Sequence, residues 1–268
     1  MSLSNKARIL LASIMGIGLT FIYFPLSVVV VNSFNSSKTF SWPPNKLTFQ
    51  WWQKAIDNTG VREALGWSII AGLSATAIAL ILGTCLAFAV ARYEFFGRET
   101  ISLLVVLPIS LPGIVTGLAL NNAFNQTLGI GTSIFTIIIG HATFCIVIVY
   151  NNAVARLKRM GTSLQEASMD LGANGFTTFR LITLPNISSA LFAGGLLAFG
   201  LSFDEIVVTT FTAGPGIQTL PVWIFNNLFR PNQAPIVNVV AATLVFISIV
   251  PIYLSQRLSS DSASGGRI

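Results

Sequence analysis

Residues 9–31 read ILLASIMGIGLTFIYFPLSVVVV, a run of 23 residues without a charged side chain. An α-helix needs roughly 20 mostly apolar residues to cross the hydrocarbon core of a membrane. Lys6 and Arg8 precede the run, but a secretory signal has a shorter apolar core and a small-residue cleavage site. We therefore expect residues 9–31 to form an uncleaved first membrane span.

The composition places the whole chain in the membrane class. Its 268 residues are 53% hydrophobic and only 9% charged, whereas soluble domains carry about 25% charged residues. The net charge of +6 comes from basic residues scattered between apolar runs, which favours membrane topology over a nucleic-acid surface. Cys85 and Cys145 both fall inside apolar runs, so we expect buried free thiols, and the chain has neither metal-ligand spacing nor a disulfide framework.

Six apolar runs are long enough to be membrane spans, which predicts an all-α polytopic membrane protein with one transmembrane domain over residues 1–268. The six predicted spans are Ile9–Val31, Ala64–Ala91, Thr100–Leu120, Thr132–Ala155, Ile187–Ala213 and Ile236–Leu254. Proline is tolerated in a spanning helix where neighbouring groups satisfy the freed carbonyls. Because Pro108 and Pro112 both fall in the third predicted span, we expect the sharpest bend there.

The distribution of basic residues predicts the orientation. With the N-terminus placed inside, the inner segments hold ten lysines and arginines and the outer segments five. The positive-inside rule then predicts that both termini of a multi-pass membrane protein are cytoplasmic. All five tryptophans fall in or next to predicted outer segments, as an interfacial belt would. In one of these segments, residues 48–57 place Trp51, Trp52, Ala55 and Ile56 on one face, which predicts a short amphipathic helix on the membrane surface.

The inner segment between the fourth and fifth predicted spans, residues 156–186, is long for a simple connection. Ser163 followed three residues later by Glu166 is the pattern of a capping box, which predicts that a helix begins there. Gly172 follows as a stop signal.

A second short helix is predicted after this stop, over Phe176–Ile182, with Pro185 ending it. The segment is therefore predicted to form a helix, a Gly-rich break and a helix on the cytoplasmic side. Ala167 and Gly172 are small enough to let the surface of another protein approach closely.

The spacing of this segment resembles the coupling motif of ATP-binding cassette (ABC) importer permeases. The residues are Glu166-Ala167-Ser168, then three residues, Gly172, nine residues, and Ile182-Thr183-Leu184-Pro185. The family pattern is Glu-Ala-Ala, three residues, Gly, nine residues and Ile-x-Leu-Pro, and the one departure is Ser168 in place of the second Ala. The position before the penultimate span also matches.

This resemblance implies that the helix sits in a groove on an ATPase subunit and moves when two ATPases close on ATP. It ties docking most closely to Glu166 and Gly172. Ala167, Ser168 and Pro185 belong to the same motif, and Asp170 and Arg180 are expected as polar contacts.

The chain contains no Gly-x-x-x-x-Gly-Lys-Ser/Thr phosphate loop. We therefore expect no directly bound cofactor and no ATP hydrolysis by that route in this chain, with ATP–Mg bound instead by a partner ATPase dimer. Six spans also form too small a pathway alone. We expect a second permease subunit, identical or homologous, to complete it within the lipid bilayer.

Two adjacent carboxylates, Asp204 and Glu205, fall inside the fifth predicted span. A charge at the membrane centre costs about 2.5–3.5 kcal/mol on insertion scales, so both are expected to face a cavity or a partner. On a continuous helix one polar stripe is formed by Ser202, Glu205, Thr209 and Thr212, with Asp204 about 100° away. Two interpretations stay open: the carboxylates line the substrate pathway and favour a cationic group, or they form a structural pair that holds subunits together.

Ser202-Phe203-Asp204-Glu205, followed by the stretch from Thr209 to Gly214, resembles the spermidine/putrescine branch of the same permeases, and the block Gly140–Gly214 is similar to a polyamine or 4-aminobutyrate permease of that branch. The resemblance covers nearly the whole chain. It implies the type I ABC importer permease fold, an external substrate-binding protein and a small amine substrate such as spermidine, putrescine or 4-aminobutyrate. In such systems the binding protein selects the substrate.

The alternative function is an ion-coupled secondary transporter of a cationic solute, but six spans without an internal repeat and the inner motif argue against it. An intramembrane enzyme lacks support, because no predicted span carries a Ser/His dyad or a set of metal ligands. His141 is expected to be a packed, hydrogen-bonded histidine, with a proton role in the pathway as the other interpretation. Gly113 and Gly117 form a Gly-x-x-x-Gly face, which predicts close helix packing.

Overall fold

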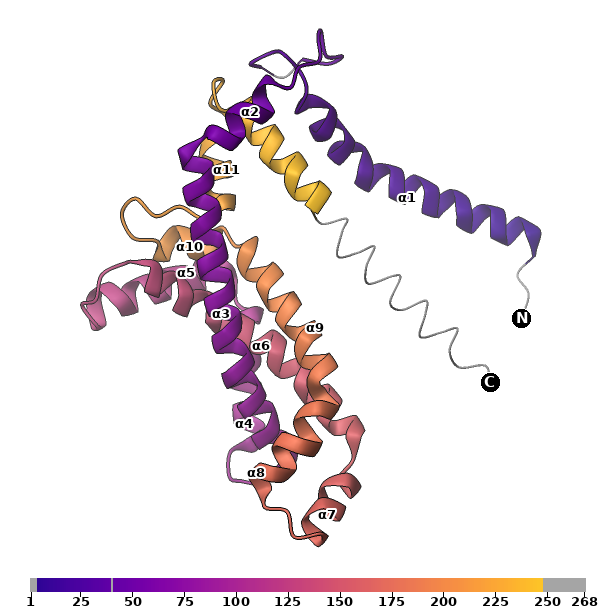
Figure 1. The fold of residues 1–268 in the computed structure, drawn as a ribbon, viewed down its shortest axis with the longest axis vertical. Helices are drawn as coiled ribbons and strands as arrows, with labels where there is room; N and C mark the ends of the chain where they lie inside the picture. The colour runs from indigo at the N-terminus through magenta and orange to yellow at the C-terminus, as the bar shows by residue number, and fades with distance from the viewer. Residues whose placement is uncertain (1–3, 40, 248–268) are drawn as a thin grey trace. The chain divides into compact units, whose positions relative to one another are not determined.

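The computed structural model describes residues 4–39 and 41–247. The chain divides into two compact units, one formed by residues 1–62 and 224–268 and the other by Glu63–Trp223. Both units are helical and the described residues contain no strand, which confirms the predicted all-α class (Figure 1).

The first unit begins with α1 (Asn5–Asn32), which confirms the helix predicted over residues 9–31. The Ser4 hydroxyl accepts the N–H of Ala7 over 3.3 Å and caps its start. None of the most apolar 18-residue window of α1 is buried. A helix that is apolar on all sides and unburied within its own chain is suited to lipid contact.

The amphipathic helix predicted near residues 48–57 forms as α2 (Gln50–Asp57). Its predicted apolar face is only partly correct. Trp51 and Ala55 are buried, whereas Ile56 is 65% exposed. The reason is that α2 packs on its own chain: Trp51 Nε1 donates to the carbonyl of Asn35 over 2.9 Å.

The second unit contains most of the remaining helices. They are α3 (Thr59–Arg92), α4 (Arg98–Ser110), α5 (Gly113–Asn122), the π-helical η1 (Ala123–Thr127), α6 (Ile134–Met160), α7 (Ser163–Asp170), α8 (Gly175–Thr178), the π-helical η2 (Phe179–Thr183), α9 (Leu184–Phe203), α10 (Val207–Thr212) and α11 (Leu220–Asn227). Two of them extend beyond its limits, because α3 begins before Glu63 and α11 ends after Trp223.

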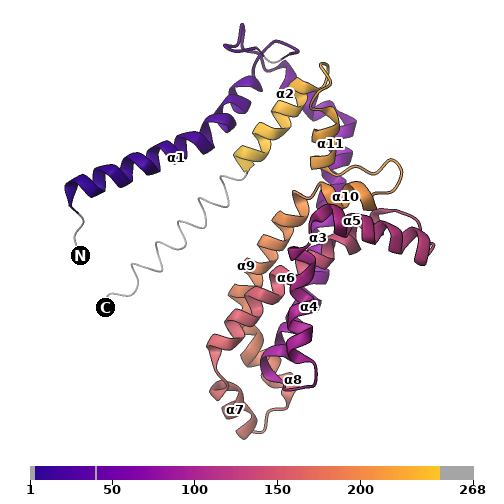
Figure 2. The same ribbon diagram turned by 180° about the vertical axis from the view of Figure 1, so that it is seen from behind.

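Small residues allow α3, α6 and α9 to pack closely in the second unit (Figure 1 and Figure 2). α3 presents a buried residue of this kind at every fourth position: Ala71, Ala75, Ala79, Gly83 and Ala87. A Cβ atom added to Gly83 would lie 3.0 Å from the carbonyl oxygen of Ile146 on α6. Helices in membranes associate mainly through such close packing, since lipid removes the hydrophobic drive between them.

The third predicted span is broken rather than continuous, and the expected bend is confirmed. α4 and α5 meet at an angle of 104°. Leu111 precedes a proline and is extended, with ψ 144°, because the proline ring disfavours the helical region for the residue before it. The predicted close-packing face of α5 is also present: a Cβ atom on Gly117 would lie 2.8 Å from the Phe211 ring of α10.

Four helices of the described residues are long and apolar enough to span a membrane, or five if α4 and α5 with η1 form one broken span. A shorter apolar helix covers Ala234–Ile247 and begins the predicted sixth span. The rest of that span, residues 248–254, lies outside the described residues, so the number six stays a prediction. Of the two thiols, Cys145 is buried as expected, but Cys85 is exposed on the surface of α3.

Candidate functional site

The predicted inner helix forms as α7, but its predicted capping box does not. Ser163 is the first helical residue, and Thr162 occupies the capping position without a side-chain hydrogen bond. The N–H groups of Gln165 and Glu166 instead donate to the backbone carbonyl of Thr162 over 2.9 and 3.0 Å. Backbone bonds therefore start α7, and the Ser163 hydroxyl does not cap it.

The predicted break after α7 is confirmed, and its geometry explains the glycine. Gly172 has a φ of +87°, in the left-handed region that costs other L-residues roughly 1–2 kcal/mol. The N–H of Ala173 donates to the carbonyl of Ser168 over 3.1 Å, and the N–H of Gly172 to that of Met169 over 2.9 Å. This pair of bonds is a Schellman motif. A Cβ atom at residue 172 would meet none of the described residues within 4 Å, so it is the backbone conformation that requires glycine here.

Pro185 does not end a helix, contrary to the prediction. α8, η2 and α9 form one continuous apolar helix over Gly175–Phe203, and Pro185 lies at the start of α9. A proline lacks the N–H needed in a helix interior. The π-helical turn adapts to it: the N–H of Leu184 bonds to the carbonyl of Phe179, and the Asn186 amide donates to the carbonyl of Ile182 over 2.7 Å.

One buried and one partly buried side-chain hydrogen bond hold α7 against η2 and α8. Gln165 Nε2 donates to Thr183 Oγ1 over 2.7 Å, and the hydroxyls of Ser168 and Thr178 lie 3.1 Å apart. Thr183 belongs to the quoted coupling motif, but neither Gln165 nor a bond between the two residues was predicted from the sequence. The two residues lie 18 positions apart in the chain, and no local sequence pattern indicates that they pair.

Arg92 fixes the point where the segment leaves α6. Its Nη2 atom donates to the carbonyls of Leu157 and Gly161 over 3.2 and 2.8 Å. These carbonyls lie at the C-terminal end of α6, which has no further turn to satisfy them and attracts positive charge. The sequence also gave no sign of this role for Arg92.

The exposed surface of this inner segment, residues 156–186, carries both apolar and charged side chains. Among the motif residues, Glu166, Ala167, Asp170, Gly172, Arg180 and Pro185 are exposed, and Ser168 is half-buried. Leu171 is 90% exposed and Phe176 is 72% exposed. The structure thus brings the predicted coupling residues together at one end of the second unit, where α7 and α8 lie (Figure 1).

The second predicted site lies at a break in the chain, and not on a continuous helix through Ala213 as predicted. α9 ends at Phe203 and α10 begins at Val207. Glu205 Oε1 accepts the N–H of Val208 over 2.8 Å, and this bond satisfies a backbone donor at the start of α10. Asp204 is exposed and Glu205 is half-buried.

His141 on α6 joins the two sides of this break, which confirms it as a packed, hydrogen-bonded residue. Its Nδ1 atom lies 2.7 Å from Ser202 Oγ, and its Nε2 atom lies 2.8 Å from Thr209 Oγ1. Thr209 Oγ1 donates its one proton to the carbonyl of Glu205 over 2.9 Å. It must therefore accept from Nε2–H, which leaves Nδ1 of a neutral ring to accept from Ser202.

Ser202, Thr209 and Thr212 are therefore interior residues in this chain, since all three are buried. Thr212 Oγ1 donates to the carbonyl of Val208 over 2.8 Å. Of the residues predicted for a substrate pathway, only Asp204 and Glu205 present charge at the surface of the break.

Comparison with known proteins identifies the class of molecule. Residues 79–261 match the family described as binding-protein-dependent transport system inner membrane component. The chain belongs to this family. It is a permease subunit of an ABC importer, and its role is transport rather than catalysis.

Relatives support the same assignment over most of the chain. It is 32% identical to the spermidine/putrescine transport system permease protein PotC of Escherichia coli strain K12, covering 91% of this chain and 92% of that protein. It is 34% identical to the putrescine transport system permease protein PotI of the same strain, with coverages of 90% and 89%.

A solved structure supports the fold. A chain of a bacterial ABC transporter involved in the import of the acidic polysaccharide alginate matches with a TM-score of 0.72 and 16% identity, covering 97% of this chain and 99% of that one. The type I importer permease fold expected from the sequence is thereby confirmed.

Proposed function

We propose that this permease subunit forms half of the pathway for a small amine of the spermidine and putrescine class, or for the related 4-aminobutyrate. The names of the two relatives support this class. The break between α9 and α10 adds a physical reason, because the exposed carboxylate of Asp204 and the half-buried one of Glu205 attract an ammonium group.

The α7–α8 segment is the proposed attachment point for a partner ATPase dimer, which binds and hydrolyses ATP–Mg. This proposal rests on one observation: one face of α7 is fixed to the permease by hydrogen bonds, while apolar side chains of the segment are exposed. The Gln165–Thr183 bond holds α7 from behind, while Leu171 and Phe176 are exposed. Apolar side chains held rigidly outward mark a protein interface.

The remaining partners follow from the same architecture. A second, homologous permease subunit completes the pathway, and an external substrate-binding protein delivers the amine. Both termini lie on the cytoplasmic side of the inner membrane. In support of this orientation, Arg92, Arg156, Lys158 and Arg159 gather at the end of the second unit that carries α7, as the positive-inside rule requires of a cytoplasmic end.

Uptake of labelled putrescine and spermidine into membrane vesicles tests the function. Cells express the chain with its partner subunits, ATP is supplied inside the vesicles, and ion gradients are collapsed with ionophores. We expect uptake to persist and to require ATP. Uptake that stops with the gradient and ignores ATP would favour an ion-coupled transporter instead. If ATP drives the uptake of neither amine, the proposed amine class is rejected. The assignment to an importer then still stands, because it rests on the family match.

A further inference from the structure

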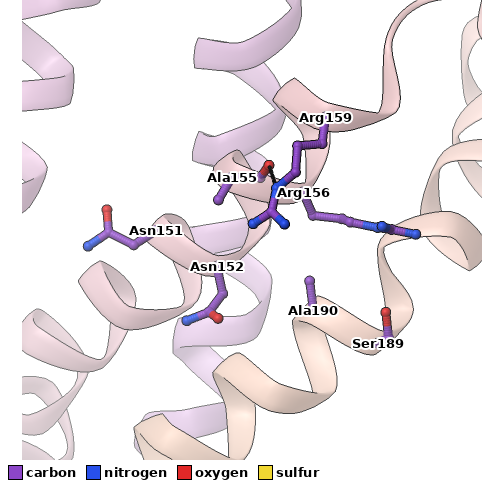
Figure 3. A pocket seen from close by; sticks show the side chains of 7 residues that line it. All are labelled: Asn151, Asn152, Ala155, Arg156, Arg159, Ser189 and Ala190. Carbon is purple, nitrogen blue, oxygen red and sulfur yellow. Dashed lines mark hydrogen bonds between the residues drawn. The ribbon is translucent and has the colours of Figure 1, made fainter. Parts of the chain in front are cut away.

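A polar cavity of about 410 Å³ lies between α6 and α9, near the end of the unit that carries α7. Figure 3 shows the side chains that line it, five from α6 and two from α9. They are Asn151, Asn152, Ala155, Arg156, Arg159, Ser189 and Ala190. We propose that this cavity binds the phosphate group of an anionic membrane phospholipid.

The lining of the cavity has a net positive charge. Arg156 and Arg159 both line it, and none of the described lining residues carries a carboxylate. Arg156 Nε donates to the carbonyl of Asn186 over 3.0 Å, and Arg159 Nε donates to that of Ala155 over 3.3 Å. These bonds use one N–H of each guanidinium and orient it.

The remaining donors suit a phosphate. Each guanidinium has five N–H groups, and within the described residues the terminal nitrogens of Arg156 and Arg159 have no protein partner. Guanidinium groups bind phosphate oxygens in a bidentate manner. The Ser189 hydroxyl adds a neutral donor at the same cavity. Asn151 also lines the cavity, but Figure 3 shows its amide turned away from the two arginines.

The surface next to the cavity favours a lipid over a free anion. Ser189 is followed on the same face of α9 by Phe192, Ala193 and Leu196, at steps of three, four and seven residues. All three are exposed, Phe192 by 70% and Leu196 by 56%. A phospholipid has the same order of chemistry, with a phosphate at the end of the span and acyl chains along the apolar helix. Basic pockets between membrane helices bind anionic headgroups in this way.

The test measures lipid binding to the full-length chain in detergent by native mass spectrometry, with phosphatidylglycerol, phosphatidylcholine and inorganic phosphate as separate probes. We expect the chain to retain phosphatidylglycerol in preference to phosphatidylcholine. Arg156→Gln and Arg159→Gln should each weaken that binding about fivefold, since a basic side chain at a membrane surface contributes about 1 kcal/mol.

Two further variants keep the test decisive. Lys158→Gln removes the same charge between the two arginines but does not line the cavity, so it should leave binding unchanged. Ala190→Glu adds a carboxylate to the lining and leaves both arginines in the sequence. It should abolish the preference for phosphatidylglycerol. Circular dichroism and a single size-exclusion peak check that each variant folds.

Three results would overturn the proposal. An equal loss for Lys158→Gln would mean that diffuse charge, rather than this cavity, attracts the lipid. Equal retention of phosphatidylcholine would mean that the apolar surface alone binds lipid. Displacement of phosphatidylglycerol by inorganic phosphate would assign the cavity to a free anion.

Discussion

The Nε2 atom of His141 lies 2.8 Å from the Oγ1 atom of Thr209, and both side chains are fully buried. Through this bond, and a second bond to Ser202, α6 holds the end of α9 and the start of α10. The break that presents Asp204 and Glu205 is therefore fixed by a residue on another helix.

The first prediction concerns this link. His141→Ala leaves the buried Ser202 hydroxyl without a partner in the described residues, whereas Thr209 Oγ1 keeps its bond to the Glu205 carbonyl. An unsatisfied buried polar group costs about 1–3 kcal/mol. We expect a lower thermal stability of the purified chain and a loss of amine uptake. Thr143→Ala is the matched control, because among the described residues Thr143 Oγ1 bonds only to the Gly140 carbonyl of its own helix. If both variants unfolded at the same temperature, the link would have no special role.

The second prediction concerns the start of α7. The sequence pattern assigns the cap to Ser163, but the structure places that residue inside the helix without a cap bond. Ser163→Ala should therefore change the free energy of unfolding by less than about 0.5 kcal/mol, whereas loss of a true N-cap costs about 1 kcal/mol. Hydrogen exchange of the α7 amides measures the difference. Faster exchange throughout α7 in the variant would instead support the predicted capping box at Ser163.

Gln165 supplies the contrasting variant. Gln165→Leu removes the donor to Thr183 and leaves a buried hydroxyl unsatisfied. We expect α7 amides to exchange faster and ATP-driven uptake to fall, while the chain still inserts in the membrane. Because Gln165 is buried, an effect on uptake without faster exchange would contradict a holding role.

Much of this architecture follows from local sequence, because the length of an apolar run, the proline at residue 112 and the glycine at residue 172 each act on their own neighbourhood. The errors occur where individual hydrogen bonds, and not periodicity or residue type, decide the outcome. Pro185 reads as a stop, yet η2 and the Asn186 amide carry the helix through it. Ser202 and Thr209 fit a helical stripe, yet Glu205 starts a new helix and His141 takes both hydroxyls. No periodicity encodes those contacts.

The fourth prediction separates backbone from partner at Gly172. Its φ of +87° means that Gly172→Ala destabilises the turn by roughly 1–2 kcal/mol, and Gly172→Asn less, since Asn tolerates this region better. None of the described residues lies within 4 Å of a Cβ atom built there, so Gly172→Trp should be no worse than Ala for the fold. Co-purification of the ATPase should nevertheless be lost for Trp and retained for Asn. If the ATPase co-purified equally with Gly172→Trp and Gly172→Ala, contact with the ATPase would not explain the need for glycine at this position.

The last prediction concerns the two carboxylates. Asp204 is exposed, and its side chain makes no hydrogen bond within the described residues. Asp204→Asn should leave stability unchanged and raise the KM for a cationic amine, because a negative charge on the proposed pathway is lost. Glu205→Gln keeps an oxygen that accepts the Val208 N–H, so it also tests charge more than structure. Glu205→Ala removes that acceptor and should lower the thermal stability as well. Uptake of putrescine at several concentrations, with thermal stability of each variant, separates the two effects. An unchanged KM for putrescine in Asp204→Asn and Glu205→Gln, together with fewer assembled complexes, would instead assign the pair to subunit assembly.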